Sequence, residues 1–276
     1  MTLVWEILGG AAAGSVLAHV GRRARMLDQG SAWSLAAAVT ALSALGGWLW
    51  GATMVLTALA VGLATSIRRR QSSWRLPPPP PLSIEAICAR LAWPVSLAVL
   101  SRFTPLDLFV AYTGGLAAAC ADAWATHFGI LSKVPPRTLA GARAAVPGMP
   151  GAISTLGILA SAGGSGLIGF AALACLSLQP LFDHAAPMSR ALWLPLSALV
   201  GGFSGSLFDS FLAGTAQALY YCENCGTFSE TPIHSCGEPA RHVRGWTWMT
   251  NEAVDASASV IGAGIASATM SLLAWL

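Results

Sequence analysis

Four carboxylates lie in or beside long apolar stretches of this sequence. Asp122 follows fourteen uncharged residues (108–121), and Asp209 closes an uncharged run that begins at 191. Glu252 and Asp255 stand at the start of the last apolar stretch. A carboxylate in hydrocarbon is costly, so such residues usually mark a function or an ion pair. Carboxylate oxygens are also the ligands that Mg²⁺ prefers, so these acids are candidates for a catalytic Mg²⁺ site.

The segment between 132 and 154 is cationic and rich in glycine and proline. Cations, bare glycine amides and a helix that begins near Gly151 together make a phosphate cradle. The candidate phosphate-binding or nucleotide-binding residues are Lys133, Arg137, Arg143, Gly148, Gly151 and Ser154. Acids beside such a loop are typical of Mg²⁺-dependent phosphoryl transfer. Two alternatives stay open: the cations only set membrane topology, or the acids only form structural ion pairs.

A polar segment at 221–248 holds four soft metal ligands, Cys222, Cys225, His234 and Cys236. A Cys-x2-Cys pair is the usual first half of a tetrahedral zinc site, and His-x-Cys is a less standard second half. A disulfide between Cys236 and one of the other two cysteines is the alternative. Because the charge distribution places this segment in the reducing cytosol, structural Zn²⁺ is the favoured interpretation.

These groups sit in a chain built for a lipid environment. It has 276 residues, of which 55% are hydrophobic and 10% charged, with a mean hydropathy of +0.63. An average soluble domain is about 25% charged. So few charges cannot cover a soluble core, which excludes a soluble enzyme, a disordered chain and a nucleic-acid binder. We expect one integral membrane domain over 1–276, with 221–248 as a cytoplasmic Cys/His-rich insert.

The uncharged windows predict an all-α, polytopic membrane bundle of about eight transmembrane helices. A spanning helix needs about 20 mostly apolar residues. The uncharged window 29–67 holds 39 residues, so it fits two spans joined at Gly46-Gly47. The expected helices are 3–20, 31–48, 50–67, 86–101, 106–129, 152–178, 191–219 and 253–275.

The basic residues predict the orientation of this bundle. Lys and Arg are retained in cytoplasmic loops. With eight spans, 13 of the 15 cations fall on one side, and only Arg102 and Arg190 fall on the other. We therefore expect cytoplasmic basic loops, both chain ends on the opposite side, and an endomembrane location. All four acids would then meet at the cytoplasmic face.

Several of these segments resemble the transmembrane protein 19 family, once filed as domain of unknown function 92. The resemblance rests on 121–132 (ADAWATHFGILS), 147–154 (PGMPGAIS), 208–210 (FDS) with 214–217 (GTAQ), and the Cys/His segment. This family includes the phytyl-phosphate kinase of the vitamin E pathway. The resemblance covers nearly the whole chain.

The resemblance implies a fold related to CTP-using polyprenol kinases, and kinase activity on an isoprenoid phosphate. Asp122 matches the Asp of the family's Ala-Asp-Thr-Trp motif, and Asp209 matches that of its Asp-Ser motif. Gly148 and Gly151 match the Pro-x-Gly-Thr-x-Gly loop, and Asn251 matches the first residue of an Asn-Asp pair, which makes it a further nucleotide-site candidate.

The chain departs from the family pattern at functional positions. His127 stands where the family usually has Glu, Met149 replaces the Thr of the Gly-rich loop, and Glu252 replaces the Asp of the Asn-Asp pair. His127 is therefore either a substitute ligand or base, or a packed, hydrogen-bonded histidine. On the first interpretation the catalytic candidates are Asp122, Asp209, His127 and Glu252.

Three hypotheses follow. The first is a Mg²⁺-dependent prenyl-phosphate kinase that uses CTP or another nucleoside triphosphate, with Asp122 and Asp209 on the metal. Its partners would be the lipid bilayer and an isoprenoid phosphate, and no nucleic acid. The second is a transporter or channel whose buried acids form a proton or cation path, and the third is a non-catalytic membrane scaffold that docks a partner through the Cys/His segment. Because the acids gather at one face and no inverted repeat is visible, the first is favoured.

Overall fold

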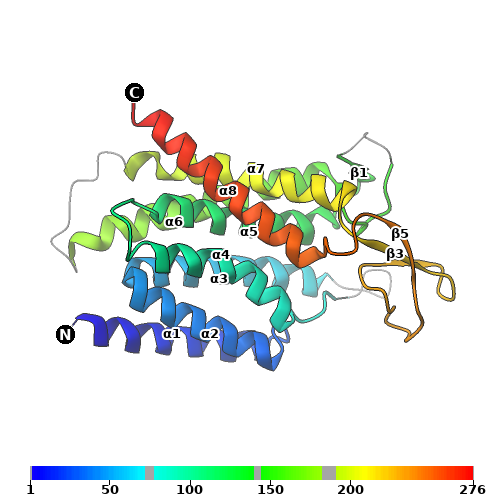
Figure 1. The fold of residues 1–276 in the computed structure, drawn as a ribbon, viewed down its shortest axis with the longest axis horizontal. Coiled ribbons are helices and arrows are strands. Elements are labelled where there is room, and N and C mark those ends of the chain that lie inside the picture. The colour runs from blue at the N-terminus through cyan, green and yellow to red at the C-terminus, as the bar shows by residue number, and fades with distance from the viewer. Residues whose placement is uncertain (1, 72–77, 140–143, 182–190, 276) are drawn as a thin grey trace.

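A computed structural model describes residues 2–71, 78–139, 144–181 and 191–275 (Figure 1). Eight α-helices form within these ranges: α1 (Thr2–Arg23), α2 (Gln29–Gly46), α3 (Trp48–Arg70), α4 (Ile84–Leu100), α5 (Phe109–Gly129), α6 (Thr155–Leu178), α7 (Leu194–Thr215) and α8 (Asn251–Leu273). Each lies within a few residues of a helix expected from the sequence. The short 3-10 turns η1 (Gln179–Leu181) and η2 (Ala191–Trp193) flank the segment between α6 and α7.

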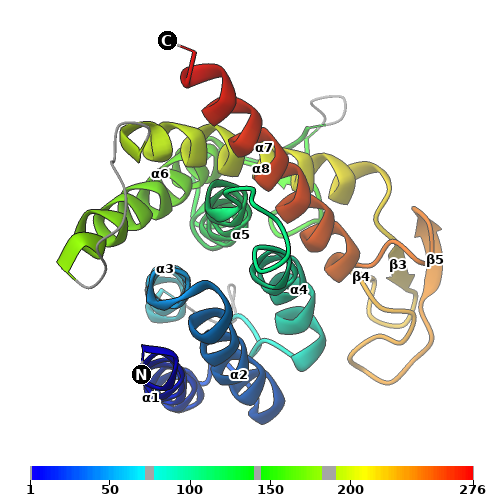
Figure 2. The ribbon, with the colours of Figure 1, turned by 60° about the vertical axis from the view of Figure 1, so that its left-hand side comes forward.

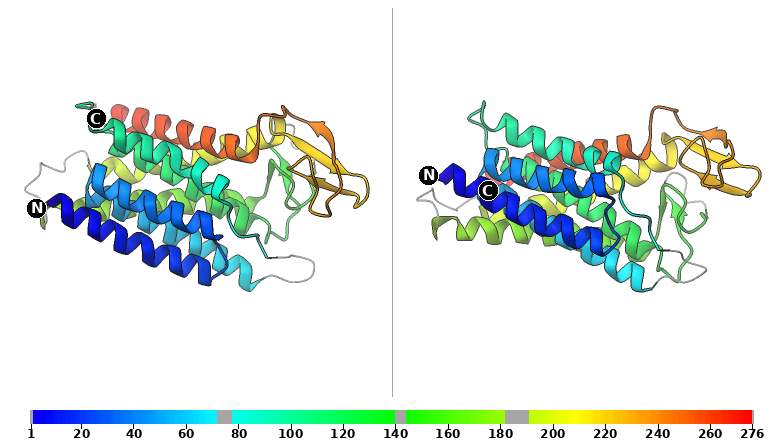
Figure 3. Two further views of the ribbon diagram at one scale, coloured as in Figure 1. Left: turned by 60° about the horizontal axis from the view of Figure 1, so that its bottom comes forward. Right: turned by 90° about the horizontal axis from the view of Figure 1, so that it is seen from below.

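The helices run alternately up and down along one elongated bundle. Both chain ends lie at one end of it, and all the β-strands lie at the other, called here the strand end (Figure 1; Figure 3). At the turn between α2 and α3, Gly47 has φ +84°, a conformation that suits glycine. The predicted hairpin at this position is confirmed.

Helix α5 occupies the centre of the bundle (Figure 2). It packs against α3, α4, α6, α7 and α8, while α1 and α2 pack on one side, against α3 and α4. Hydrogen bonds connect α5 to α3. The Tyr112 hydroxyl donates to the Trp50 carbonyl at 2.6 Å, and the Trp124 indole donates to the Ala60 carbonyl at 3.0 Å.

Small residues let α5, α7 and α8 approach closely. A Cβ added at Gly202 of α7 would lie 2.7 Å from the Ala117 Cβ of α5, and one at Gly205 would lie 2.7 Å from the Ala118 Cβ. In lipid, helices associate by such close packing because the surrounding hydrocarbon supplies no hydrophobic drive. The backbones that carry the acidic residues are therefore held at short range.

Five of the described helices, α1, α3, α6, α7 and α8, are long and apolar enough to cross a membrane. The other three are shorter or more polar: α4 has 17 residues, and α5 carries Asp122 and His127. The chain is thus mostly helical, with several candidate spans. Eight spans remain a prediction for α2, α4 and α5.

The prediction of an all-α chain is wrong at the strand end. Strands β1 (Arg137–Thr138) and β2 (Ala152–Ile153) pair antiparallel. Strands β3 (Leu219–Cys222), β4 (Thr227–Ser229) and β5 (Arg241–Arg244) form an antiparallel sheet in the order β4-β3-β5.

Two predicted helix boundaries fail at these strands. Residues 152–153 are β2, and α6 begins only after Ser154, whose hydroxyl caps the Gly157 amide at 3.1 Å. Helix α7 ends at Thr215 instead of 219, because Tyr220 and Tyr221 belong to β3, where aromatic side chains are favoured.

Candidate functional site

A cavity of about 330 Å³ opens at the strand end of the bundle. Its walls come from α5, α6, α7 and the start of α8, with Arg90 of α4 beside them. The loop from Pro147 to Ser154 forms one side, and Gln217 and Glu230 reach it from the segments around β3 and β4. Six separate parts of the chain therefore build one site.

Three carboxylates meet in this cavity. Asp122 of α5, Asp209 of α7 and Asp255 of α8 each present an oxygen atom, and these atoms lie within 4.8 Å of one another. Asp122 is seven residues before the end of α5, about 10 Å from the helix terminus at 1.5 Å per residue. Asp209 and Asp255 are at most 9% exposed. The three side chains could serve one cation as ligands.

Arg90 is the cation of this cluster. Its Nε donates to Asp255 Oδ2 at 2.9 Å, with 24% of the Arg90 side chain and 7% of the Asp255 side chain exposed. The Asn251 amide donates to the same oxygen at 3.5 Å. Three carboxylates beside one guanidinium leave a formal excess of two negative charges when all are ionised. That excess matches one divalent cation.

Buried polar atoms in the cavity lack partners among the described residues. Asp209 Oδ2 and Ser161 Oγ are both buried without a hydrogen-bond partner. Buried polar groups almost always find a partner, so an unpartnered one points to water, an ion or a ligand. Both residues line the cavity.

The glycine-rich loop faces the carboxylates across the cavity. Gly148 and Gly151 have φ +85° and +78°, conformations that glycine adopts without strain. Gly151 lies directly against the backbone of Gly214 in α7, where no Cβ would fit. The loop leads into the N-terminus of α6, which Ser154 caps and whose dipole favours an anion.

The structure does not bring every predicted residue to the cavity. Lys133 and Arg137 are exposed at the strand end and are not among the cavity-lining residues, whereas Arg143 lies outside the described residues. His127 bonds through Nε2 to the Thr65 hydroxyl of α3 at 3.1 Å, as a packed histidine would, and does not line the cavity. A role for His127 beside the metal is not supported.

The predicted acid Glu252 is also absent from the cavity-lining residues. Asp255, three residues later, is the α8 carboxylate that joins Asp122 and Asp209. Gly148, Gly151, Ser154 and Asn251 line the cavity as expected.

Three cavity residues were not candidates in the sequence. Arg90 carried the same signal as the acids, a charge inside an apolar helix, but it was assigned only to topology. Gln217 was noted only within the GTAQ segment at 214–217, with no role assigned, and Glu230 gave no local signal. Burial raises the pKa of Glu230, and Glu252 and Asp255 add to the rise, while the nearby Gln217 amide opposes it.

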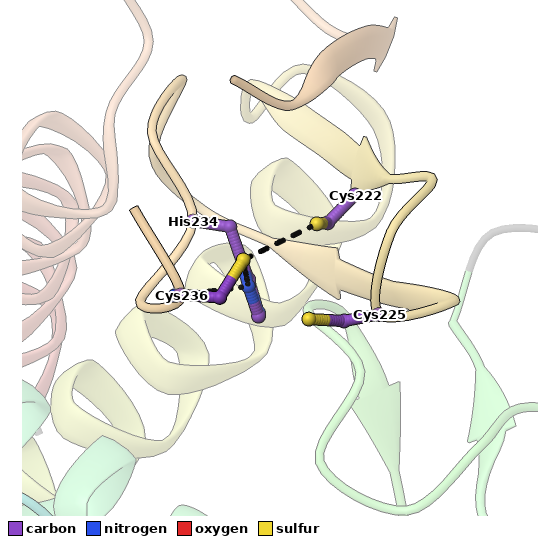
Figure 4. Close-up of side chains that lie close together, drawn as sticks. All are labelled: Cys222, Cys225, His234 and Cys236. Atoms are coloured by element: carbon purple, nitrogen blue, oxygen red, sulfur yellow. Dashed lines mark hydrogen bonds between the residues drawn. The ribbon is translucent and has the colours of Figure 1, made fainter. Parts of the chain in front are cut away.

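A second cluster lies in the β3–β5 region. Ligand atoms of Cys222, Cys225, His234 and Cys236 lie within 4.8 Å of one another. The four side chains point toward one another from two turns (Figure 4). All six cysteines are free.

Comparison with known proteins relates this chain to integral membrane proteins. The family model described as "Integral membrane protein DUF92" matches residues 12–263. "Protein PGR" of Arabidopsis thaliana is 29% identical over 120 residues, which is 42% of this chain and 41% of the relative. The match thus spans about two fifths of that relative's length. No solved structure matches.

Proposed function

The chain belongs to the integral membrane protein DUF92 family, and from this premise we propose that it is a Mg²⁺-dependent isoprenoid phosphate kinase. It would transfer the terminal phosphoryl group of CTP or another nucleoside triphosphate to a polyprenyl or phytyl phosphate. The observation that carries the proposal is the convergence of Asp122, Asp209 and Asp255 opposite a glycine-rich loop in one cavity.

The carboxylates fit the requirements of a divalent ion. Their oxygens converge within 4.8 Å, one of them on Asp209 is buried without a partner, and Arg90 already balances one charge. Mg²⁺ bound to these oxygens would neutralise phosphate charge as the phosphoryl group transfers. Arg90 and Asn251 orient Asp255 through its Oδ2 atom.

The opposite side of the cavity fits an anion. Gly148 and Gly151 offer backbone approach without side chains, and the N-terminus of α6 directs its dipole toward the cavity. Gln217, which is 1% exposed, offers an amide donor beside Glu230. In this assignment these groups bind the phosphates. Lys133 and Arg137, which lie outside the cavity, would attract the negatively charged substrates toward it.

Phosphoryl transfer is tested directly with the full chain in detergent or nanodiscs. γ-labelled CTP, ATP, GTP and UTP are offered with phytyl or geranylgeranyl monophosphate and Mg²⁺. Label should appear in the lipid diphosphate only with Mg²⁺. Asp122→Asn and Asp209→Asn should each reduce the rate more than 100-fold, since outer-shell partners alone are worth about 10- to 100-fold. Glu85→Gln, at an exposed acid of the same end, is the matched control.

The cation-transport alternative makes the opposite prediction. Apart from the Cys/His set, the described chain holds one metal-capable group of three or more side chains, and that group is at one end of the bundle. A path across a membrane needs further polar sites along its length. Carboxylate-dependent cation flux in liposomes, with no label transfer from any donor, would overturn the kinase proposal. Absence of both activities would favour a scaffold.

A further inference from the structure

The Cys/His cluster has the geometry of a tetrahedral metal site. Cys222 Sγ and Cys236 Sγ are 3.8 Å apart. Two sulfurs bonded to zinc at about 2.3 Å and a tetrahedral angle are separated by about 3.8 Å. His234 directs Nδ1 at the same centre, 3.1 Å from Cys236 Sγ. The cluster therefore offers three sulfurs and one nitrogen around a common point (Figure 4).

The surrounding contacts fix the ligands in this arrangement. The other ring nitrogen of His234 bonds to the Thr227 hydroxyl at 3.3 Å, which leaves Nδ1 directed at the cysteines. Metal-bound histidines use their second nitrogen in this way. Cys222 is fully buried on β3, although the other three ligands are on the exposed turns.

Both turns have the backbone of a metal knuckle. The Gly226 amide closes the first turn onto the Cys222 carbonyl at 2.9 Å, and the Gly237 amide closes the second onto the His234 carbonyl at 2.8 Å. Gly226 and Gly237 have φ +66° and +90°. Glycine in this conformation lets the chain reverse within four residues, so that both ligands of each turn face inward.

Between the two turns, β4 pairs with β3, and Ser229 and Thr231 make local hydrogen bonds, but the segment buries little apolar surface. Phe228 and Ile233 are its large apolar side chains, and they are 48% and 64% exposed. Burial of so little apolar surface does not offset the entropy of ordering a loop of this length. Glu230 nevertheless lies in the middle of this segment and lines the carboxylate cavity.

The sheet that carries the cluster is attached to the catalytic helices. The Ala218 amide bonds to the Met249 carbonyl at 2.9 Å, and the Trp246 amide bonds to the Ala216 carbonyl at 2.9 Å. An Arg244 Nη atom donates to the Ala213 carbonyl of α7 at 2.7 Å. The sheet is thereby fixed to the end of α7 and the start of α8, next to Asp209 and Asp255.

We propose that Cys222, Cys225, His234 and Cys236 bind one structural Zn²⁺ ion, and that this ion holds Glu230 over the carboxylate cavity. The zinc site does not depend on the kinase proposal. Its tests read metal content and backbone protection, so a failed kinase assay leaves them intact.

The metal is tested by elemental analysis of the full chain in detergent, purified under reducing conditions. One zinc per chain is expected. Cys225→Ser/Cys236→Ser and His234→Ala should lose it, whereas His234→Cys should retain it because four cysteines also bind zinc. Cys88→Ser, at an exposed cysteine of α4, is the control. Cobalt exchanged into the wild type should give the visible bands of tetrahedral thiolate coordination.

Two results would overturn the zinc site. One is a wild-type protein that holds no stoichiometric zinc even after zinc is supplied. The other is a Cys222–Cys236 or Cys225–Cys236 disulfide found by mass spectrometry in protein kept from oxidants.

The holding role is tested by hydrogen exchange with and without a zinc chelator. Amides of 226–237 should exchange at least 10-fold faster without zinc, while those of α5 keep their protection. The same change should appear in His234→Ala and be absent in His234→Cys. Unchanged exchange in 226–237 after complete zinc removal would refute the link to Glu230.

Discussion

At the residue scale, the cavity holds a cluster of three carboxylates but only one guanidinium close enough to form an ion pair with them among the described residues. Asp209 keeps a buried oxygen without a partner in the described chain, and only Asp255 of the three carboxylates has an ion pair there. Two close carboxylates repel each other when ionised, so the folded state lacks stabilisation that a divalent ion can supply.

The first prediction follows from this uncompensated charge. Mg²⁺ should raise the Tm of the wild type, because an ion that binds only the folded state adds about 2.7 kcal/mol at 100 times its Kd. Asp209→Asn should abolish most of this rise. Thermal unfolding in detergent with and without Mg²⁺ measures it. Glu85→Gln should keep the full rise, and an equal rise in Asp209→Asn would exclude this cluster as the Mg²⁺ site.

The second prediction concerns Arg90. Arg90→Gln leaves Asp255 without its 2.9 Å partner, and breaking a buried pair typically costs about 3–5 kcal/mol. Since Arg90 is partly exposed, we expect the lower end of that range. Arg90→Gln/Asp255→Asn should recover most of the loss, because the net charge of the cluster is then the same as in the wild type. Unfolding of the three proteins in detergent measures this, and additive losses would contradict a direct pair. Arg102→Gln, at the opposite end, is the control.

At the element scale, the loop before α6 and the end of α7 depend on each other. A Cβ at Gly151 would overlap the backbone of Gly214, whereas a Cβ at Gly214 would make an ordinary contact with Gly151 at 3.6 Å. This contact sets the distance between the glycine-rich loop and Asp209, five residues before Gly214 in the same helix.

The third prediction separates this contact from backbone strain. Gly148→Ala and Gly151→Ala both place a side chain at positive φ, which costs about 1–2 kcal/mol. A Cβ at Gly148 would meet only the tip of Ile130 at 3.6 Å, whereas one at Gly151 runs into α7. Gly151→Ala should therefore lower the Tm and the transfer rate further than Gly148→Ala. Equal effects would mean that only the conformation of the loop matters.

Local sequence patterns predicted the helices and half of the cavity. Apolar runs separated by charges locate all eight helices, and the cost of a charge in lipid singles out Asp122 and Asp209. The same patterns did not reveal the β-strands, which depend on short segments pairing at the end of α7. They also missed the partnership of Arg90 with Asp255, since 165 residues separate the two and nothing local links them. Glu230 reaches the cavity only through the tertiary position of the sheet.

At the scale of the whole molecule, the strand end gathers most of the cations. Arg22, Arg68 and Arg69 end their helices there, and Lys133 and Arg137 follow α5. Arg102 lies at the other end, where it donates to the Ala44 carbonyl at 2.8 Å. Because Lys and Arg are retained in cytosolic loops, this distribution of cations favours a cavity that opens toward the cytosol.

The fourth prediction tests this orientation and the crossing of α4 and α5. In a Cys88→Ser background, Lys133→Cys should react with an impermeant maleimide applied to the cytosolic face of sealed vesicles. Phe103→Cys, in the exposed turn between α4 and α5, should react only after permeabilisation. Labelling of both cysteines from the same side would contradict eight spans. The Cys88→Ser variant without an added cysteine measures any reaction of the zinc-ligand cysteines with the maleimide.

The ion pair between Arg90 and Asp255 can form only late in synthesis of the chain, because 165 residues separate its partners. A ribosome adds about 5–20 residues per second, so about 8–33 seconds pass between synthesis of the two partners. If α4 crosses the bilayer as predicted, its guanidinium has to reach toward the interface during that interval, because its carboxylate partner does not yet exist. In a chain truncated before Asp255, Arg90 would lack this partner permanently.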